Sequence, residues 1–269
     1  MSATIAQSLR DGRVVAGRNL IKIRRNPELL LFSTLQPIMF VVLFGYVFGA
    51  AIQTSDGVNY REFLMAGIFT QTVAFGSAFT CVGLADDLQK GIIDRFRALP
   101  MSRASVLIGR TTSDLVNNSF VVLVMSLSGL AIGWRIRSSV PEAMLGLVIL
   151  LLFAYSISWV SALIGLSVSS VEVANSAGFL WLFPVTFISN AFVPTDNMPA
   201  VLKAIAEWNP VTAVSTACRK LFGNTNEDLA PLTSFPDRHA ELLAVGWSLA
   251  LLLIFVPLAV RKYRLAASR

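Results

Sequence analysis

Six long stretches of the chain carry no charged residue and consist mostly of Leu, Val, Ile, Phe, Ala and Gly. They contain between 19 and 29 residues each and cover residues 29–55, 63–85, 115–134, 143–171, 173–195 and 242–260. A helix that crosses a bilayer needs about 20 predominantly apolar residues. The pattern therefore predicts an all-α membrane protein with six transmembrane helices.

Composition and charge placement agree with this prediction. Of the 269 residues, 55% are hydrophobic and 14% are charged, whereas an ordinary soluble domain carries about 25% charged residues. The 22 basic and 16 acidic residues give a net charge of +6, which by itself would also suit a nucleic-acid-binding protein. The basic residues cluster, however, before the first span, after the second and after the sixth. The positive-inside rule then places both termini in the cytoplasm and leaves no reason to expect nucleic acid.

The segment before the first span has the pattern of an amphipathic helix. Apolar side chains fall on one face of a helix over residues 5–25, and arginines occupy the remaining faces. Asn26 and Pro27 end this helix. A basic helix with one apolar stripe suits the membrane interface, so residues 1–28 are expected to form a cytoplasmic interface helix.

Residues 86–99 form a second amphipathic segment, between the second and third spans. Four apolar residues share one helical face: Leu88, Ile92, Phe96 and Leu99. Asp86 and Asp87 suit the positive end of a helix dipole, and Pro100 ends the helix. The pattern fits a helix that docks on a soluble partner with Phe96 as its anchor, and it equally fits a solvated connection.

The long segment between the fifth and sixth spans predicts two short external helices, one beginning near Pro199 and one near Pro210. Asn209 ends the first and Gly223 the second, and together they would form a cap at the membrane surface. The chain, residues 1–269, is thus expected to be a single transmembrane domain with five parts. These are an interface helix (1–28), spans one to five (29–193), an external segment (194–240), a sixth span (241–260) and a cytoplasmic tail (261–269).

Motifs for catalysis or metal binding are missing from the sequence. There is no Gly-x-x-x-x-Gly-Lys-Ser/Thr phosphate loop, no Gly-x-Ser-x-Gly and no His-Glu-x-x-His. His239 is the single histidine, and Cys81 and Cys218 are too far apart in sequence to indicate a disulfide framework. Arg110 and Asp114 are predicted to form a local ion pair at the start of the third span. We therefore expect that the chain is not itself an enzyme and that it binds no metal.

Aromatic and amide side chains inside the spans are the candidates for a substrate path. The set comprises Phe40, Phe44, Phe75, Asn117 and Asn118. Phenylalanines at helical spacing could line a path for an apolar aromatic molecule, or could pack against neighbouring helices and lipid. The two asparagines could bind substrate or could join helices through hydrogen bonds. Both interpretations stay open at this point.

Several motifs resemble those of the permease subunits of ABC-2 type transporters, in particular the daunorubicin-resistance type of drug exporter. The most specific is residues 90–103, which is similar to the family's Gly-apolar-apolar-Asp/Glu-Arg-x-Arg-x-Leu-Pro pattern. The others are Arg24-Arg25-Asn26-Pro27, Gln36-Pro37, Phe192-Val193-Pro194, Met198-Pro199, Asn209-Pro210-Val211-Thr212 and Arg219. The resemblance covers nearly the whole chain.

The resemblance implies a half-transporter in a bacterial plasma membrane. Two copies, or this chain and a paralogous permease, would form the pore, and two separate ABC ATPase subunits would dock beneath it. ATP and Mg²⁺ would bind to the ATPase, so this chain is expected to bind no cofactor. The cytoplasmic segment after the second span would be the coupling helix, and its ATPase-contacting residues would be Asp86, Asp87, Leu88, Lys90, Gly91, Ile92, Asp94, Arg95, Phe96, Arg97 and Leu99.

The expected activity is export of an amphipathic drug, lipid or polyketide-like molecule, driven by the ATPase subunit. One alternative is export of a polysaccharide or another glycoconjugate, because members of the family differ in cargo. A second alternative is a channel or secondary carrier that needs no ATPase. Such a carrier is expected to have acidic residues or broken helices at mid-membrane, and no chain of acidic residues crosses the predicted spans.

Overall fold

The computed structural model describes most of the chain, namely residues 16–17, 27–44, 46, 59–92, 103–195, 198–225 and 234–266. Within these residues the regular structure is entirely helical, which confirms the all-α class. The helices are α2 (Pro27–Leu43), α3 (Tyr60–Gly76), α4 (Ala78–Gln89), α6 (Arg103–Ala131), α7 (Val140–Gly165), α8 (Val171–Leu180), α9 (Leu182–Phe187), α10 (Ala200–Glu207), α11 (Pro210–Leu221), α12 (Phe235–Arg238) and α13 (Ala240–Ala266).

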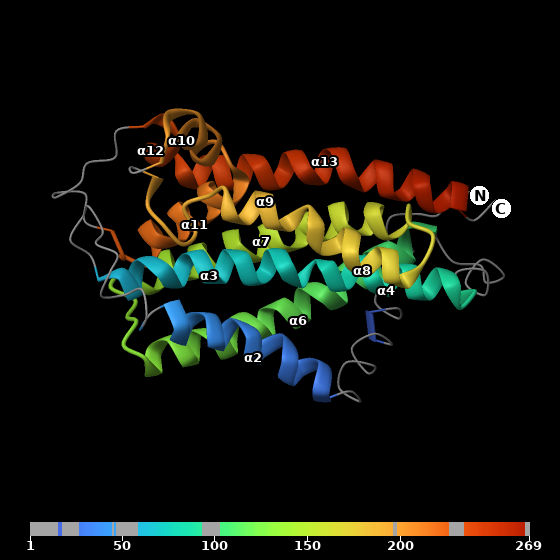
Figure 1. The fold of residues 1–269 in the computed structure, drawn as a ribbon, viewed down its shortest axis with the longest axis horizontal. Helices are drawn as coiled ribbons and strands as arrows, with labels where there is room; N and C mark the ends of the chain where they lie inside the picture. The colour runs from blue at the N-terminus through green and yellow to red at the C-terminus, as the bar shows by residue number, and fades with distance from the viewer. Residues whose placement is uncertain are drawn as a thin grey trace.

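Four stretches in the described part are long and apolar enough to cross a membrane. They are Tyr60–Gln89, Ala104–Ala131, Val140–Gly165 and Ala240–Leu265. Figure 1 shows α3–α4, α6, α7, α8–α9 and α13 lying along the long axis of the molecule, with α2 against α3 and α6. The described parts of the first and fifth predicted spans are shorter helices, α2 and α8–α9.

Helix α7 forms the centre of the bundle and contacts α3, α4, α6, α8, α11 and α13. Its mean hydropathy is high on every face, as expected for a helix that is surrounded by other helices. Phe153 and Trp159 are fully buried in it. Helix α13, by contrast, buries little of its apolar surface, as expected for a helix that faces lipid.

The expected start of the coupling helix at Asp86 is wrong. Residues 86–89 form the last turn of α4 rather than the first turn of a new helix. The helix ends at Lys90 and Gly91, and Gly91 adopts a left-handed conformation with a φ of +63°. Asp86 therefore lies at a negative helix end, where Lys90 offsets its charge through an ion pair of 2.8 Å.

The third span is also longer than its charge-free run. Helix α6 begins at Arg103, so Arg110 and Asp114 lie inside it instead of at its start. A charged pair can remain within an apolar helix when the two charges are bonded to each other. Nε of Arg110 lies 3.2 Å from Oδ2 of Asp114, which confirms the predicted ion pair.

The fifth predicted span is the one most changed by tertiary structure. Helices α8 and α9 meet at Trp181, and α9 ends at Phe187. Residues 188–195 continue as irregular backbone, which is tolerated at membrane depth only where other parts of the protein cover it. Helix α11 supplies this cover, since nearly all of its residues are buried.

Polar side chains around α11 bind the irregular segment. Nδ2 of Asn209 donates to the carbonyl oxygens of Val185 and Ile188, both at 2.7 Å. The Arg219 guanidinium donates from Nε to the Phe63 carbonyl at 2.8 Å and from Nη2 to the Asn190 carbonyl at 2.7 Å. The carbonyl groups at and after the end of α9 that lack a partner within their own helix therefore accept hydrogen bonds from side chains of α11 and its N-cap.

The two short helices of the predicted external segment lie at the expected positions, as α10 and α11. Only α10 resembles a surface cap, because its apolar side chains Val201, Leu202 and Ile205 are exposed. Helix α11 instead packs into the bundle against α3, α7 and α13. The C-terminal end of α11 is bonded to the loop between α6 and α7, because Nε1 of Trp134 in this loop donates to Oδ1 of Asn224 at 2.8 Å.

Candidate functional site

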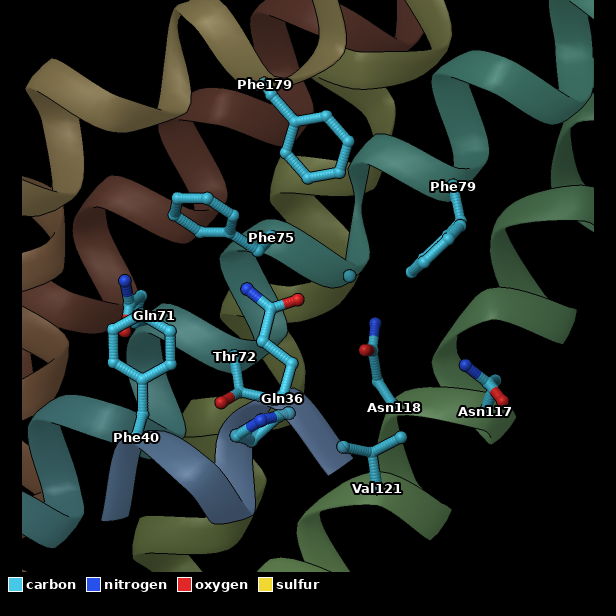
Figure 2. A pocket seen from close by; sticks show the side chains of 12 residues that line it. Gln36, Phe40, Gln71, Thr72, Phe75, Phe79, Asn117, Asn118, Val121 and Phe179 are labelled. Carbon is cyan, nitrogen blue, oxygen red and sulfur yellow. The ribbon is translucent and has the colours of Figure 1, made fainter. Parts of the chain in front are cut away.

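A cavity of about 140 Å³ opens among α2, α3, α4, α6 and α8 (Figure 2). Its wall is built from phenylalanines, amides and small residues of these helices: Gln36, Pro37, Phe40, Gln71, Thr72, Phe75, Gly76, Phe79, Asn117, Asn118, Val121 and Phe179. Most ligand sites in proteins combine an apolar, aromatic wall with a few polar groups that orient the ligand. The cavity has this composition.

Four of the five substrate-path candidates line this cavity, although they come from three different helices. Phe40 belongs to α2, Phe75 to α3, and Asn117 and Asn118 to α6. The fifth, Phe44, lies beside the cavity and stacks on Phe40 with ring centroids 5.6 Å apart. The fold thus brings these residues together, and their role in transport remains a prediction.

Amide groups reach into the cavity from opposite sides. Figure 2 shows the Gln36 amide extending from α2 and the Asn118 amide extending from α6 toward the space below the Phe75 and Phe79 rings. Asn118 is 2% exposed, and its Nδ2 atom has no hydrogen-bond partner. Oδ1 of Asn117 is likewise buried and unbonded. Buried polar atoms usually have partners, so these two atoms mark a place where a polar partner would be favourable.

A continuous row of aromatic rings extends from the cavity along the α9 side of the bundle. Successive ring centroids are 5.2 to 6.3 Å apart, within the range of favourable aromatic contacts. The row comprises Phe179, Phe75, Phe183, Phe187, Phe192, Phe40 and Phe44. Phe183 and Phe187 are about half exposed, so part of the row faces outward.

Sequence reasoning missed the contribution of the fifth span to this site. Phe179, Phe183 and Phe187 recur every four residues, the same spacing that identified Phe40 and Phe44. That signal was present in the sequence and could have found them. Gln36 and Thr72 have no such signal, because only the packing of α2 on α3 places them at the cavity.

The ion pair of α6 lies one helical turn from the cavity, since Asp114 precedes Asn118 by four residues. Thr80 of α4 donates to Oδ2 of Asp114 at 2.5 Å, and Nη2 of Arg110 donates to the Phe79 carbonyl at 2.7 Å. These bonds join α4 to α6. They fix the part of α4 that carries Phe79 in the cavity wall.

The expected coupling residues lie only partly within the described chain. Asp86, Asp87 and Leu88 are in the last turn of α4, and Lys90, Gly91 and Ile92 follow it. Leu88 lines an open groove of about 610 Å³ that is bounded by residues 166–170 and by Lys262 of α13. The remaining coupling residues lie outside the described residues, namely Asp94, Arg95, Phe96, Arg97 and Leu99. Nearly all of the predicted N-terminal helix also lies outside them.

Comparison with known proteins assigns the chain to a family. Residues 11–222 match the family described as ABC-2 type transporter. The daunorubicin resistance ABC transporter permease protein DrrB1 of Streptomyces coeruleorubidus is 30% identical over 247 residues, covering 92% of this chain and 83% of that protein.

Two further relatives are more distant. The putative transport permease ycf38 of Cyanophora paradoxa is 27% identical over 90% of this chain and 83% of its own. The probable doxorubicin resistance ABC transporter permease protein DrrC of Mycobacterium tuberculosis (strain ATCC 25618 / H37Rv) is 23% identical over 80% of this chain and 76% of its own. The helical bundle, its apolar spans and these matches lead to one conclusion: the chain belongs to the ABC-2 type transporter family of membrane permeases.

Proposed function

We propose that this chain is the transport subunit of an ATP-driven exporter, and that it moves an amphipathic molecule out of the cell with energy from a separate ABC ATPase. The observation that carries the proposal is the cavity, because the fold brings Phe40, Phe75, Asn117 and Asn118 together at one place within the bundle. An aromatic wall with unbonded amide groups suits a molecule that is largely apolar and carries a few polar groups.

The connection from ATPase to cavity would be helix α4. One end of α4 leads to Gly91 and the coupling residues, and the other meets α3 at Ser77, next to Phe75 and Phe79 in the cavity wall. Helix α4 has 12 residues, which corresponds to about 18 Å. A displacement of its far end would therefore reach the cavity through a rigid element.

The break at Ser77 gives α4 a place to pivot. Oγ of Ser77 donates to the Ala74 carbonyl at 2.6 Å and lies 2.8 Å from Oγ of Ser161 on α7. These contacts tie the junction of α3 and α4 to the central helix. ATP binding by two docked ATPases would tilt α4 about this junction and change the shape of the cavity.

The assembly we propose contains six spans per chain, two permease chains and two ATPases in a bacterial plasma membrane. The second permease would be another copy or a paralogue. Helices α2 and α8–α9 would complete the six crossings, because Figure 1 shows them running beside the longer helices. Both termini would then be cytoplasmic, because α2 begins, and α4 and α13 finish, at the same end of the bundle (Figure 1).

Substitution of Phe96 tests the coupling assignment. We expect Phe96→Ala to lose the co-purifying ATPase, and to reduce export at least about tenfold, because a central aromatic anchor in an interface contributes about 2 kcal/mol. The measurement is a detergent pull-down of the tagged chain from its native membrane, followed by identification of bound proteins. Phe235→Ala, at an exposed phenylalanine of α12, is the matched control. A chain that co-purifies with no ATPase would contradict the proposal.

Cysteine labelling tests the orientation. Val201 of α10 and Leu265, in the last turn of α13, are both exposed. Helix α10 and the end of α13 lie at opposite ends of the bundle (Figure 1). We expect an impermeant maleimide to label Val201→Cys in intact cells and Leu265→Cys only after permeabilisation. The native Cys81 and Cys218 are fully buried, so the unmodified chain is expected to stay unlabelled. The reverse pattern would show that the termini are outside.

A further inference from the structure

The cavity is lined entirely by uncharged side chains, and this restricts what it can hold. Its polar groups are the amides of Gln36, Gln71, Asn117 and Asn118 and the hydroxyl of Thr72. A charged ligand would lose its hydration there and would gain no counter-ion. The nearby Arg110 and Asp114 do not line the cavity and are bonded to each other.

The size of the cavity matches one aromatic ring. At about 140 Å³ it is close to the 150 Å³ of engineered protein cavities that bind benzene. Figure 2 shows the Phe75, Phe79 and Phe179 rings on one side of this space and the amides below them. Rings of this kind favour edge or offset contacts with another planar ring.

The buried amides indicate which hydrogen-bonding group a ligand in the cavity would need. Nδ2 of Asn118 is a donor without an acceptor, and Oδ1 of Asn117 is an acceptor without a donor. An unbonded amide within a bundle of spanning helices is unfavourable unless water or a ligand pairs with it. Of these two atoms, Nδ2 of Asn118 lies toward the space under the Phe75 and Phe79 rings (Figure 2), so an occupant of the cavity can gain stabilisation by accepting a hydrogen bond from it.

From these three features we propose that the cavity binds an uncharged aromatic ring that carries a hydrogen-bond acceptor, and that this acceptor pairs with Nδ2 of Asn118. The inference rests on the proposed function and names the chemical class of its cargo, or of the part of the cargo that enters the cavity. A cargo with an ionisable group would enter in its neutral form. Apolar molecules without polar substituents would bind more weakly, because the amides would stay unbonded.

Binding of small probes to the purified full chain in lipid nanodiscs tests this inference without any ATPase. The probes are benzamide, toluene, benzoate and benzylammonium, compared by saturation-transfer NMR against empty nanodiscs. Benzamide is expected to bind at least about tenfold more tightly than toluene, which corresponds to one well-made hydrogen bond. No specific signal is expected for the two ions. Equal binding of benzamide and toluene, or binding of either ion, would overturn the inference.

Asn118→Leu is the decisive variant, because leucine has a similar volume and no polar atom. We expect it to lose benzamide binding at least tenfold, to keep toluene binding and to melt at no lower temperature than the parent chain. The matched control is Asn175→Leu, at an exposed asparagine of α8, which is expected to bind benzamide normally. Retention of benzamide by Asn118→Leu would refute the role of this amide.

A second variant keeps the test valid if Asn118→Leu folds poorly. A Cβ atom at Gly76 would overlap only the Asn118 amide, a flexible group that can move aside. Gly76→Ala is therefore expected to fold and to displace this amide into the cavity, with loss of benzamide and of toluene binding. Failure of the probes to bind a chain that still co-purifies with an ATPase and exports would refute this inference alone. Loss of the ATPase with intact probe binding would refute only the proposed function.

Discussion

Replacing Arg219 with methionine is expected to destabilise the protein by roughly 3–5 kcal/mol, because hydrogen bonds from charged groups contribute about 1.5–3 kcal/mol each. The guanidinium donates to the carbonyl groups of Phe63 and Asn190, and it lies 3.7 Å from the centroid of the Phe63 ring. The substitution leaves these carbonyl oxygens without this donor in a site from which water is excluded, since Arg219 is 3% exposed.

The free energy of unfolding in detergent micelles, followed by tryptophan fluorescence, measures this effect. Arg219→Lys is expected to give an intermediate loss, since an ammonium group cannot donate in the planar fork of a guanidinium. Lys203→Met is the control, because its ion pair with Glu207 is long, at 3.8 Å, and partly exposed. Such pairs contribute at most about 1 kcal/mol. Equal stability of Arg219→Met and Lys203→Met would show that the guanidinium does not support the irregular segment.

The second large effect is expected at the ion pair between Arg110 and Asp114. Asp114→Leu is expected to cost about 3 kcal/mol, because it leaves a guanidinium whose side chain is only 14% exposed without its carboxylate. The double variant Arg110→Leu/Asp114→Leu is expected to recover most of this loss, since a buried pair can often be replaced by apolar residues at little cost. The single variants and the double variant form a cycle that isolates the interaction.

The ion pair between Asp86 and Lys90 provides the control for this cycle. It has the same spacing of four residues on a helix, but Lys90 is 59% exposed. Its removal by Asp86→Leu is expected to cost only about 0.3–0.5 kcal/mol. If Asp114→Leu costs no more than this, the pair does not join α4 to α6. The double variant would also be expected to loosen the cavity wall at Phe79, which is measurable as weaker probe binding.

The structure also changes the interpretation of several motif residues. Asn209 and Arg219 carry part of the family resemblance in the sequence, yet neither lines the cavity. Both instead donate to carbonyl groups of residues 185–192, and Arg219 also donates to the Phe63 carbonyl of α3. Their role in this fold is to allow α9 to end inside the bundle. They thereby position the aromatic row, which includes Phe187 and Phe192.

Boundaries were the least predictable feature of the spans, for a physical reason. The sequence was divided at charged residues, and a charge inside a helix is tolerated when a neighbouring helix pairs with it. Asp114 illustrates this, because Thr80 of α4 and Arg110 both bond to its carboxylate within α6. At Asp86 a charge likewise fails to end the helix, since α4 continues past it to Gln89 before the left-handed Gly91. Helix ends depend on such partners, and a single sequence does not show them.

The membrane class, the helical fold and four of the long spans could be predicted from the amino-acid pattern, because they depend on local properties. Runs of apolar residues make a helix the favourable structure in lipid whatever their neighbours are. The phenylalanine spacing and the paired asparagines likewise identified Phe40, Phe75, Asn117 and Asn118 as candidates. That these four residues, from α2, α3 and α6, surround one cavity follows from the packing of the helices and not from any local pattern. The same holds for the entry of α11 into the bundle, because contacts between distant helices depend on packing and hydrogen bonds that no local pattern encodes.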